Sequence, residues 1–295
     1  MSSASTSPDP AKIQKVREHL REEWTGEVTV AAWRKWHAQI AAFTRGATEA
    51  LLDAAHLRPG ILVLDLACGV GDPALSIAQE VVPSGRVTAT DLGPGMMSLA
   101  EELARKKGLT NIEFREANAE SLPFTDASYD VLTCRFGIMF FPDLAKALRE
   151  CLRVLKPGGC VAFVAWGKMA QPFFTTTAGI LLKHVPSPPP PPDPEGPSLF
   201  MFGESGRLRR ALEAAGFAGV HEEDLIIAGR WTSSIEEYWE QFTEVAAPFR
   251  PLLAQLTPEK MAQAKAEIFA ALGKFWDGKE LNIPLEIVIG SGTRP

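Results

Sequence analysis

The chain has 295 residues, of which 46% are hydrophobic and 22% are charged, so it can bury a full core as one large domain with an appendage. Its formal net charge is −6 and its 30 basic residues are scattered, which argues against a nucleic-acid partner and favours a small-molecule substrate. Its apolar runs are too short to span a membrane and its first residues lack the hydrophobic core of a signal peptide, so we expect a cytoplasmic monomer or homodimer without an integral membrane segment.

The N-terminal part of the chain is expected to lie outside the main domain. Residues 1–10 predict a disordered lead, and residues 11–57 predict an N-terminal helical cap. Within the cap, residues 28–57 carry apolar side chains at steps of three and four residues, which predicts an amphipathic helix. The apolar stripe consists of Trp33, Trp36, Ile40, Phe43 and Ala47. Such a stripe most simply packs a helix onto the body of the protein.

Residues 58–170 alternate short β-rich runs with helical patterns, and they predict the core of the fold. The expected strands cover residues 61–66, 86–91, 111–116, 129–136 and 160–166, and the expected helices cover residues 72–81, 94–107 and 143–155. Strands that alternate with helices in this way form parallel sheets with right-handed crossovers. We therefore expect an open α/β sheet here.

The C-terminal part of the chain is expected to complete this sheet and to cover it. Residues 171–203 predict a linker whose proline-rich loop, residues 184–197, favours an extended polyproline segment. Residues 204–232 and 282–295 supply a helix at 205–216 and strands at 218–231 and 283–290. Residues 233–281 predict a helical lid, in which two amphipathic helices over 233–276 are divided near Pro248 and Pro251. The predicted fold class is α/β, with a Rossmann-like, mostly parallel seven-stranded sheet, helices on both faces and the lid inserted between the last two strands.

The cysteines and histidines show no metal-binding pattern. The four cysteines, Cys68, Cys134, Cys151 and Cys160, lie in apolar segments without C-x-x-C spacing. None of the five histidines has ligand spacing with an acid or a cysteine. We expect buried reduced thiols and no metal site.

The stretch ILVLDLACGVGDPALSIAQ, residues 61–79, reads as a buried strand, a glycine turn and a helix. Gly69, Gly71 and Ala74 fit the G-x-G-x-x-G/A dinucleotide pattern, and Asp91 lies 20 positions beyond Gly71, where that pattern places a ribose-binding acid. An NAD(P)-dependent oxidoreductase is therefore one interpretation. A tight turn that binds nothing is another.

Two acidic residues beside this turn favour a different ligand. Asp65 lies at the end of the strand before the glycines, and Asp72 follows them at the start of the helix. Like charges about 4 Å apart cost on the order of 1 to 4 kcal/mol at surface-like dielectrics, so a pyrophosphate is disfavoured here. A cofactor that carries an ammonium and a sulfonium, such as S-adenosylmethionine, would be attracted instead. Asp91 can bind an adenosine ribose in either case.

Five motifs in order, VLDLACGVGD, DLGPGMM, ANAESLPF, YDVLTCRFGIMFFPD and LRVLKPGG, resemble class I S-adenosylmethionine-dependent methyltransferases. The sequence is most similar to the ubiquinone and menaquinone C-methyltransferase group and to relatives that methylate natural products. The resemblance covers roughly residues 61–167 at the level of motif order. It implies S-adenosyl-L-methionine as the cofactor and S-adenosyl-L-homocysteine as its product.

The resemblance also implies which residues bind this cofactor. Those expected to surround its methionine part are Asp65, Ala67, Gly69 and Gly71, with Cys134, Arg135 and Phe136 bordering it and the substrate. Asp91 would bind the ribose, while Leu92 and Met96 would flank the adenine. Asn118 stands where the family usually has an aspartate beside the adenine amino group, and Ala119 would offer a backbone N–H. Because an asparagine after a strand also serves as ordinary turn chemistry, that alternative stays open for Asn118.

The sequence indicates less clearly which residues bind the methyl acceptor. The resemblance implies that N-terminal helices roof the active site, so Trp36 or His37 is a candidate for the pocket, although core packing is the simpler interpretation. Phe140 and Phe141 would offer an apolar surface to a small aromatic or lipophilic acceptor, or would pack the following helix. The identity of the methylated atom, oxygen, nitrogen or carbon, stays open.

The predicted reaction is methyl transfer by in-line displacement, in which positioning alone can supply several kcal/mol. A general base is therefore optional, and His37 and Tyr238 are the candidates for it. Two other hypotheses remain, namely the NAD(P)-dependent oxidoreductase and a non-catalytic protein that binds S-adenosylmethionine without an acceptor cavity.

Overall fold

A computed structural model of the chain describes residues 10–190, 193 and 196–295. The disordered lead expected over residues 1–10 lies outside this described part except for Pro10, which begins the first helix. Part of the expected polyproline segment, residues 191–192 and 194–195, also lies outside it. Among the described helices, none combines the length and apolarity that crossing a membrane requires.

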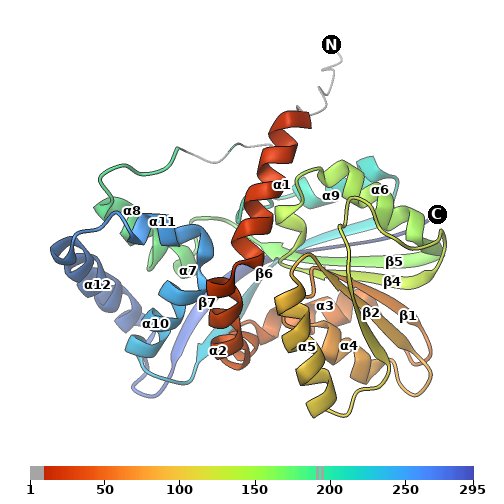
Figure 1. Ribbon diagram of the computed structural model, residues 1–295, viewed down its shortest axis with the longest axis horizontal. Helices are drawn as coiled ribbons and strands as arrows, with labels where there is room; N and C mark the ends of the chain where they lie inside the picture. Colours follow the sequence, from red (N-terminus) through yellow and green to blue (C-terminus); the bar gives the residue numbers. More distant parts are fainter. Residues whose placement is uncertain (1–9, 191–192, 194–195) are drawn as a thin grey trace.

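A seven-stranded sheet forms the centre of the molecule, as expected, with the strand order β3-β2-β1-β4-β5-β7-β6 (Figure 1). The strands are β1 (Leu62–Leu66), β2 (Arg86–Asp91), β3 (Ile112–Glu116), β4 (Tyr129–Arg135), β5 (Leu155–Trp166), β6 (Ala218–Trp231) and β7 (Leu281–Thr293). The first five pair in parallel, and β7 pairs antiparallel with both β5 and β6. The carboxyl ends of β1, β2, β4 and β5 therefore meet at one edge, where open α/β sheets bind ligands.

Helices cover both faces of this sheet. Those between or around the strands are α3 (Arg45–Ala55), α4 (Ala74–Glu80), α5 (Pro94–Lys106), α6 (Leu144–Val154) and α9 (Arg207–Ala215). Helices α3, α4 and α5 lie on one side of the sheet, and α6 and α9 lie on the other (Figure 1). Central strand residues such as Leu64, Leu132 and Phe163 are completely buried between these layers. A strand buried on both faces explains why these segments read as continuous apolar runs.

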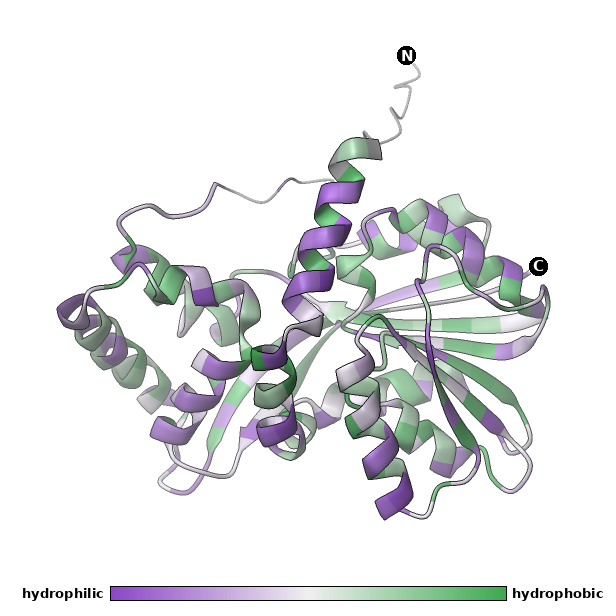
Figure 2. Cartoon of the chain, viewed as in Figure 1, coloured by the Kyte–Doolittle hydropathy of each residue, from purple (hydrophilic) through white to green (hydrophobic). Residues whose placement is uncertain are grey.

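The N-terminal cap consists of three helices rather than one long amphipathic helix. Helix α1 (Pro10–Thr25) precedes α2 (Glu27–Phe43), and the helix expected over residues 28–57 is divided between α2 and α3. The break lies at Thr44, whose backbone N–H and hydroxyl both donate to the carbonyl of Ile40. A threonine that bonds back to the preceding turn competes with helix continuation, which explains the break. Hydrophilic residues predominate along α1, with hydrophobic residues between them (Figure 2).

The lid lies beside the sheet at its β6–β7 end (Figure 1). It contains α10 (Ile235–Val245) and α12 (Pro258–Leu272), joined by η2 (Ala247–Phe249) and α11 (Arg250–Leu253), and η3 (Gly273–Phe275) follows. Two main helices were expected, and Pro248 in η2 and Pro251 in α11 lie between them. The linker expected over residues 171–203 is not wholly irregular, because it holds α7 (Pro172–Thr175) and α8 (Ala178–His184).

Polar contacts connect the lid to the cap. Lys35 Nζ on α2 contacts Glu240 at 2.6 Å and Glu244 at 3.0 Å on α10. Trp36 Nε1 donates to Glu244 Oε2 at 2.6 Å, and the Arg250 guanidinium donates to the Thr29 hydroxyl at 2.9 Å. The cap and the lid thus meet over the sheet edge that carries the carboxyl ends of the strands.

Candidate active site

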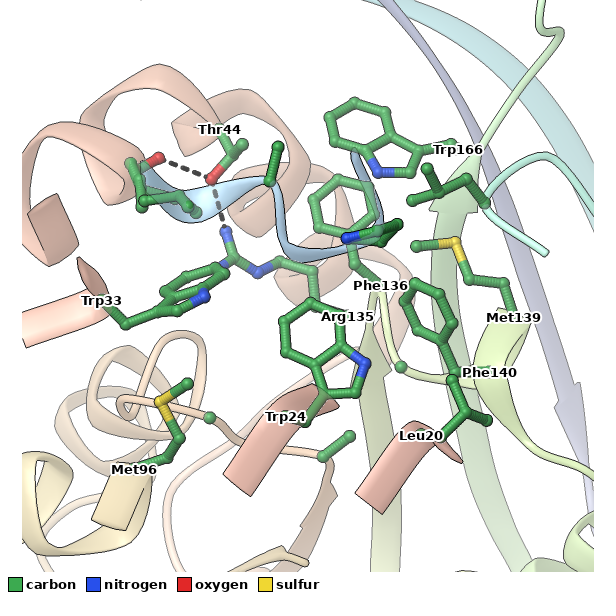
Figure 3. Close-up of a pocket in the computed structure, with 18 of the residues that line it drawn as sticks. Leu20, Trp24, Trp33, Thr44, Met96, Arg135, Phe136, Met139, Phe140 and Trp166 are labelled. Atoms are coloured by element: carbon green, nitrogen blue, oxygen red, sulfur yellow. Dashed lines mark hydrogen bonds between the residues drawn. The ribbon is translucent and has the colours of Figure 1, made fainter. Parts of the chain in front are cut away.

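A cavity of about 350 Å³ lies beneath the cap and the lid. Its walls include the ends of four strands: Leu66 of β1, Asp91 of β2, Arg135 of β4 and Trp166 of β5. One part of the wall comes from the glycine turn and the β2–α5 connection, and the other part is aromatic (Figure 3). A volume of this size falls in the range of sites that hold small organic molecules.

The glycine turn after β1 forms part of the cavity wall. Ala67 has φ +54°, Gly69 has φ +52° and Gly71 has φ +103°. A Cβ atom at Gly69 would have no neighbour within 4 Å, and Gly69 lines the cavity, so the space beside it is open to a ligand. Gly71 does not line the cavity. Its missing Cβ instead allows close packing, because a Cβ there would lie 3.0 Å from Leu75 and 3.1 Å from Ala100.

Asp91 holds this turn in place and still faces the cavity. Its Oδ2 accepts from the Gly69 N–H at 2.8 Å, and its Oδ1 accepts from the Gly93 N–H at 2.8 Å. Burial raises the pKa of Asp91, and the hydrogen bonds from Gly93 and Gly69 oppose that shift. Each carboxylate oxygen can accept a second hydrogen bond, so Asp91 can also receive hydroxyl groups from a ligand.

Asp65 is the most unusual titratable group near the cavity. It is completely buried, and its Oδ1 accepts from the Thr133 hydroxyl at 2.5 Å. Its Oδ2 is buried without a hydrogen-bond partner among the described residues. Burial raises its pKa to about 7, and the nearby Asp72 and Asp91 act in the same direction. Asp65 does not line the cavity itself, but the two residues that follow it, Leu66 and Ala67, do.

Asp72 forms an ion pair, so it does not carry the uncompensated charge that we expected from the sequence. Arg135 Nη1 lies 2.9 Å from Asp72 Oδ2, and the side chains are 8% and 21% exposed respectively. The same guanidinium donates to the hydroxyls of Thr44 and Thr48 at 2.9 Å each, and the bond to Thr44 is visible in Figure 3. Arg135 therefore neutralises Asp72 and connects the cap to the glycine turn. Of the acids beside the turn, Asp65 and Asp91 form no ion pair among the described residues, although the charge of Arg135 opposes the rise in the pKa of Asp65.

The residues expected around an adenine all line the cavity, namely Leu92, Met96, Asn118 and Ala119. The Asn118 side-chain oxygen accepts from the Glu120 N–H at 2.9 Å, which is the turn chemistry that the sequence left open. Glu120 is 1% exposed, forms an ion pair with Arg17 of α1, and accepts from the Asp143 N–H at 2.9 Å. This side of the cavity is thus closed by α1.

The other side of the cavity is aromatic. Phe136, at φ +58°, stacks on Trp166 with ring centroids 4.2 Å apart, and Trp166 stacks on Phe173 at 4.7 Å. Phe140 and Phe141 line the same cavity, so they are placed where an apolar acceptor surface was expected. Figure 3 shows Phe136 and Trp166 close together, with Phe140 between them and Leu20. A non-glycine residue in the left-handed region costs free energy, and such residues concentrate at functional sites.

Of four further residues that the sequence proposed for the site, one lines the cavity and three do not. Tyr238 lines the cavity, whereas Trp36, His37 and Cys134 are not among its lining residues. Trp36 is buried against Trp231 and Glu244. His37 Nδ1 lies 2.9 Å from the carbonyl of Arg34, and Cys134 is completely buried. The predictions that Trp36 binds substrate, that His37 is a base and that Cys134 borders the cofactor therefore gain no support from the geometry.

Several lining residues were missed by the sequence reasoning. Those on α1 are Arg17, Leu20, Arg21 and Trp24, and those on later elements include Trp166, Phe173, Phe174, Phe200, Trp231 and Phe249. The α1 residues had a readable signal, because Ile13, Leu20 and Trp24 recur at helical spacing in a segment that also carries many charges. The later ones had none, since their approach depends on tertiary packing.

Metal-binding groups do not assemble in the part of the chain that the structure describes: no three His, Cys, Asp or Glu side chains there are placed to hold an ion. The thiols of Cys68, Cys134 and Cys151 are buried and unpaired, and Cys160 is partly buried. Burial raises the pKa of Cys68 and Cys134 well above the ordinary thiol range.

Comparison with known proteins gives the family. The model of the ubiE/COQ5 methyltransferase family matches residues 31–186, which is more than half of the chain. The chain belongs to this family. The matched segment contains most of α2, then α3, the glycine turn and the strands β1 to β5, but it ends before β6 and the lid.

Individual relatives agree with this assignment. The demethylmenaquinone methyltransferase of Listeria welshimeri is 32% identical over 162 residues, which are 54% of this chain and 64% of that protein. The ubiquinone/menaquinone biosynthesis C-methyltransferase of Shewanella sediminis is 40% identical over 118 residues, which are 40% of this chain and 47% of that protein. The chain thus spans about half to two thirds of the length of the curated relatives it matches.

Solved structures share the fold. The YcgJ protein of Bacillus subtilis aligns with a TM-score of 0.55 and 22% identity, over 85% of this chain and 98% of that one. The [4+2]-cyclase SpnF aligns with a TM-score of 0.52 and 24% identity, over 84% of this chain and 79% of that one. Because a cyclase shares this architecture, the fold alone does not name the reaction, and the site of this family member must do so.

Proposed function

We propose that this member of the ubiE/COQ5 family is an S-adenosylmethionine-dependent methyltransferase that methylates a small aromatic or lipophilic molecule by in-line displacement. The observation that carries the proposal is the single cavity that joins the glycine turn and Asp91 to the aromatic wall formed by Phe136, Trp166 and Phe173. One cavity with two chemically different ends can place a donor and an acceptor side by side.

The residues at the first end fit S-adenosylmethionine. The buried Oδ2 of Asp65 has no hydrogen-bond partner among the described residues, and a cationic methionine part nearby would stabilise the ionised form of this carboxyl group. The open space at Gly69 leaves room for that part of the cofactor. Asp91 would hold the ribose hydroxyls, and Leu92 and Met96 would contact the adenine. When bound, the cofactor supplies a methyl group on a sulfonium that is already a strong donor. The protein then needs only to orient the acceptor and to exclude water from the apolar end.

The alternatives account for less of the site. A dinucleotide would bring a pyrophosphate to the turn, where the Gly69 N–H already donates to Asp91 and where Asp65 lies buried behind the wall. A non-catalytic binding protein would not need the aromatic end of the cavity. The demethylmenaquinone named for the relatives gives a first acceptor to test, because a planar ring suits stacked aromatic walls.

Calorimetric titration with S-adenosylmethionine, S-adenosylhomocysteine and NADH tests the cofactor. We expect binding of the first two, and tight binding of NADH alone would overturn the proposal. Transfer of a labelled methyl group to a panel of quinols, phenols and amines, followed by mass spectrometry of the product, then identifies the acceptor and the methylated atom. The cytoplasmic location and the monomeric or homodimeric state stay predictions, to be checked by cell fractionation and light scattering.

A further inference from the structure

Two adjoining side chains on the wall of the cavity carry buried polar groups that have no hydrogen-bond partner among the described residues. Tyr238 on α10 is 1% exposed and Trp231 at the end of β6 is 2% exposed, and both line the cavity. Neither the Tyr238 hydroxyl nor the Trp231 Nε1–H has a hydrogen-bond partner among the described residues. Buried polar groups in native proteins are nearly always hydrogen-bonded, so two unpartnered donors in one cavity call for an explanation.

Two polar aromatic side chains that do not line the cavity have hydrogen-bond partners. Trp36 does not line the cavity, and its Nε1 donates to Glu244 at 2.6 Å. Tyr129, the second of the two tyrosines, does not line it either and forms a side-chain hydrogen bond with Thr88. The buried indole N–H groups without a partner among the described residues, on Trp24, Trp33 and Trp231, all belong to lining residues. Among the buried indole and tyrosine groups, lack of a partner therefore goes with a position on the cavity wall.

The surroundings of Tyr238 are apolar. Its ring contacts Trp231 with centroids 5.5 Å apart and Phe43 at 5.7 Å. Burial alone raises the pKa of Tyr238, and no charged group contributes to that shift. Arg135, which lines the same cavity, is engaged by Asp72 and two threonine hydroxyls. A hydroxyl in this setting stays protonated at neutral pH, so it can donate a hydrogen bond but cannot serve as a base.

We propose that the Tyr238 hydroxyl and the Trp231 Nε1–H are neutral hydrogen-bond donors that position an oxygen atom of an uncharged acceptor molecule against the aromatic wall. The two rings are in T-shaped contact, so the two donors belong to adjoining side chains of the same wall. Both residues follow the segment matched by the family model, residues 31–186, so this recognition element belongs to the chain's own lid and last strands. The proposal rests on the acceptor side of the function proposed above. It favours uncharged acceptors over cationic amines and phosphates at this part of the wall, since Tyr238 and Trp231 offer neither of them a counter-ion.

A pair of probes that differ only in one oxygen tests this proposal: 1-tetralone has a carbonyl oxygen, and tetralin has the same bicyclic skeleton without it. The variants are Tyr238→Phe and the matched control Tyr129→Phe, which removes the only other tyrosine hydroxyl. Calorimetry or ligand-observed NMR should show that Y238F weakens 1-tetralone binding about tenfold, or about 1.4 kcal/mol, while tetralin binds as before. Y129F should leave both affinities unchanged.

Equal losses for both probes in Y238F would overturn the proposal, since they indicate a packing defect, and so would unchanged 1-tetralone binding. Trp231→Phe provides the second measurement if Y238F does not fold, with the same selective loss expected and the same outcomes against it. A base at Tyr238 would instead make 1-tetralone binding depend on pH between 6 and 9, whereas a protonated donor gives a flat profile. Because these probes need no cofactor, a failure of S-adenosylmethionine binding in the wild-type protein is a separate result that bears on the proposed function alone.

Discussion

The buried carboxyl group of Asp65 should make the unliganded protein less stable as the pH rises. Its pKa is about 7 in the folded state against 3.8 for an ordinary aspartate, so between these values the folded protein holds a proton that the unfolded chain has lost. Stability falls with pH wherever the folded state binds more protons. A shift of roughly 3 pKa units corresponds to about 4 kcal/mol of lost folding stability. This loss is complete above pH 7 and absent below pH 3. Asp65→Asn keeps the shape of the side chain and removes this dependence.

Urea unfolding of the wild-type protein and of Asp65→Asn at pH 5 and pH 8 measures the effect. Of the total, about 2 to 3 kcal/mol should be lost between these two pH values in the wild-type protein, over and above any loss in the variant. Other titrating groups are common to both proteins and cancel in the difference. The exposed Asp53→Asn serves as the control and should follow the wild-type curve. Parallel pH dependence of Asp65→Asn and wild type would refute the assignment of a raised pKa to this carboxyl group.

Three further predictions concern the same end of the cavity. Gly69→Arg should abolish S-adenosylmethionine binding in calorimetry while costing only about 1 to 2 kcal/mol of stability from its positive φ, because its Cβ meets no neighbour; retained affinity would mean that the turn does not contact the cofactor. Asp91→Ala should also abolish binding and cost about 2 to 3 kcal/mol in urea unfolding, since the N–H groups of Gly69 and Gly93 lose their acceptor, with circular dichroism unchanged. Arg17→Met should leave the buried Glu120 without its ion-pair partner, so limited proteolysis should cleave α1 several times faster; unchanged cleavage would show that this pair does not hold the helix.

The sheet and the glycine turn could be predicted because their signals are local. Strand β1 and the second half of β5 read as largely apolar runs since both of their faces are buried, and the turn residues Gly69 and Gly71 are needed at positive φ. Even here the sequence could not distinguish their roles. Only the packing of Gly71 against Leu75 and Ala100, and the open space at Gly69, separate a structural glycine from one that faces a ligand.

The roof of the cavity could not be predicted in the same way. Trp231 and Tyr238 are seven positions apart in a segment that reads as a strand end and a helix, and nothing local tells whether they face a cavity or the core. For Trp36 the prediction failed in the other direction, because it was a candidate for the pocket and does not line the cavity. Its place in an apolar stripe suits a pocket and a core equally, and its contacts with Glu244 and Trp231 hold it in the core. Long-range packing of the cap on the lid decides both cases.

The pairing of Asp72 with Arg135 changes the electrostatic argument about the ligand. With Asp72 neutralised, an anion at the turn would not meet two free carboxylates, so charge repulsion rests on Asp65 and Asp91. The stronger obstacle is a hydrogen bond: Asp91 already accepts from the Gly69 N–H at 2.8 Å, and this backbone donor is one that a phosphate at the turn would require. The α4 helix that follows has only 7 residues, which leaves a weak dipole to compensate. A phosphate must therefore compete with the Asp91 carboxylate for the Gly69 N–H, whereas a cationic group is attracted by the carboxylates. The turn thus selects its ligand through this hydrogen bond as much as through charge.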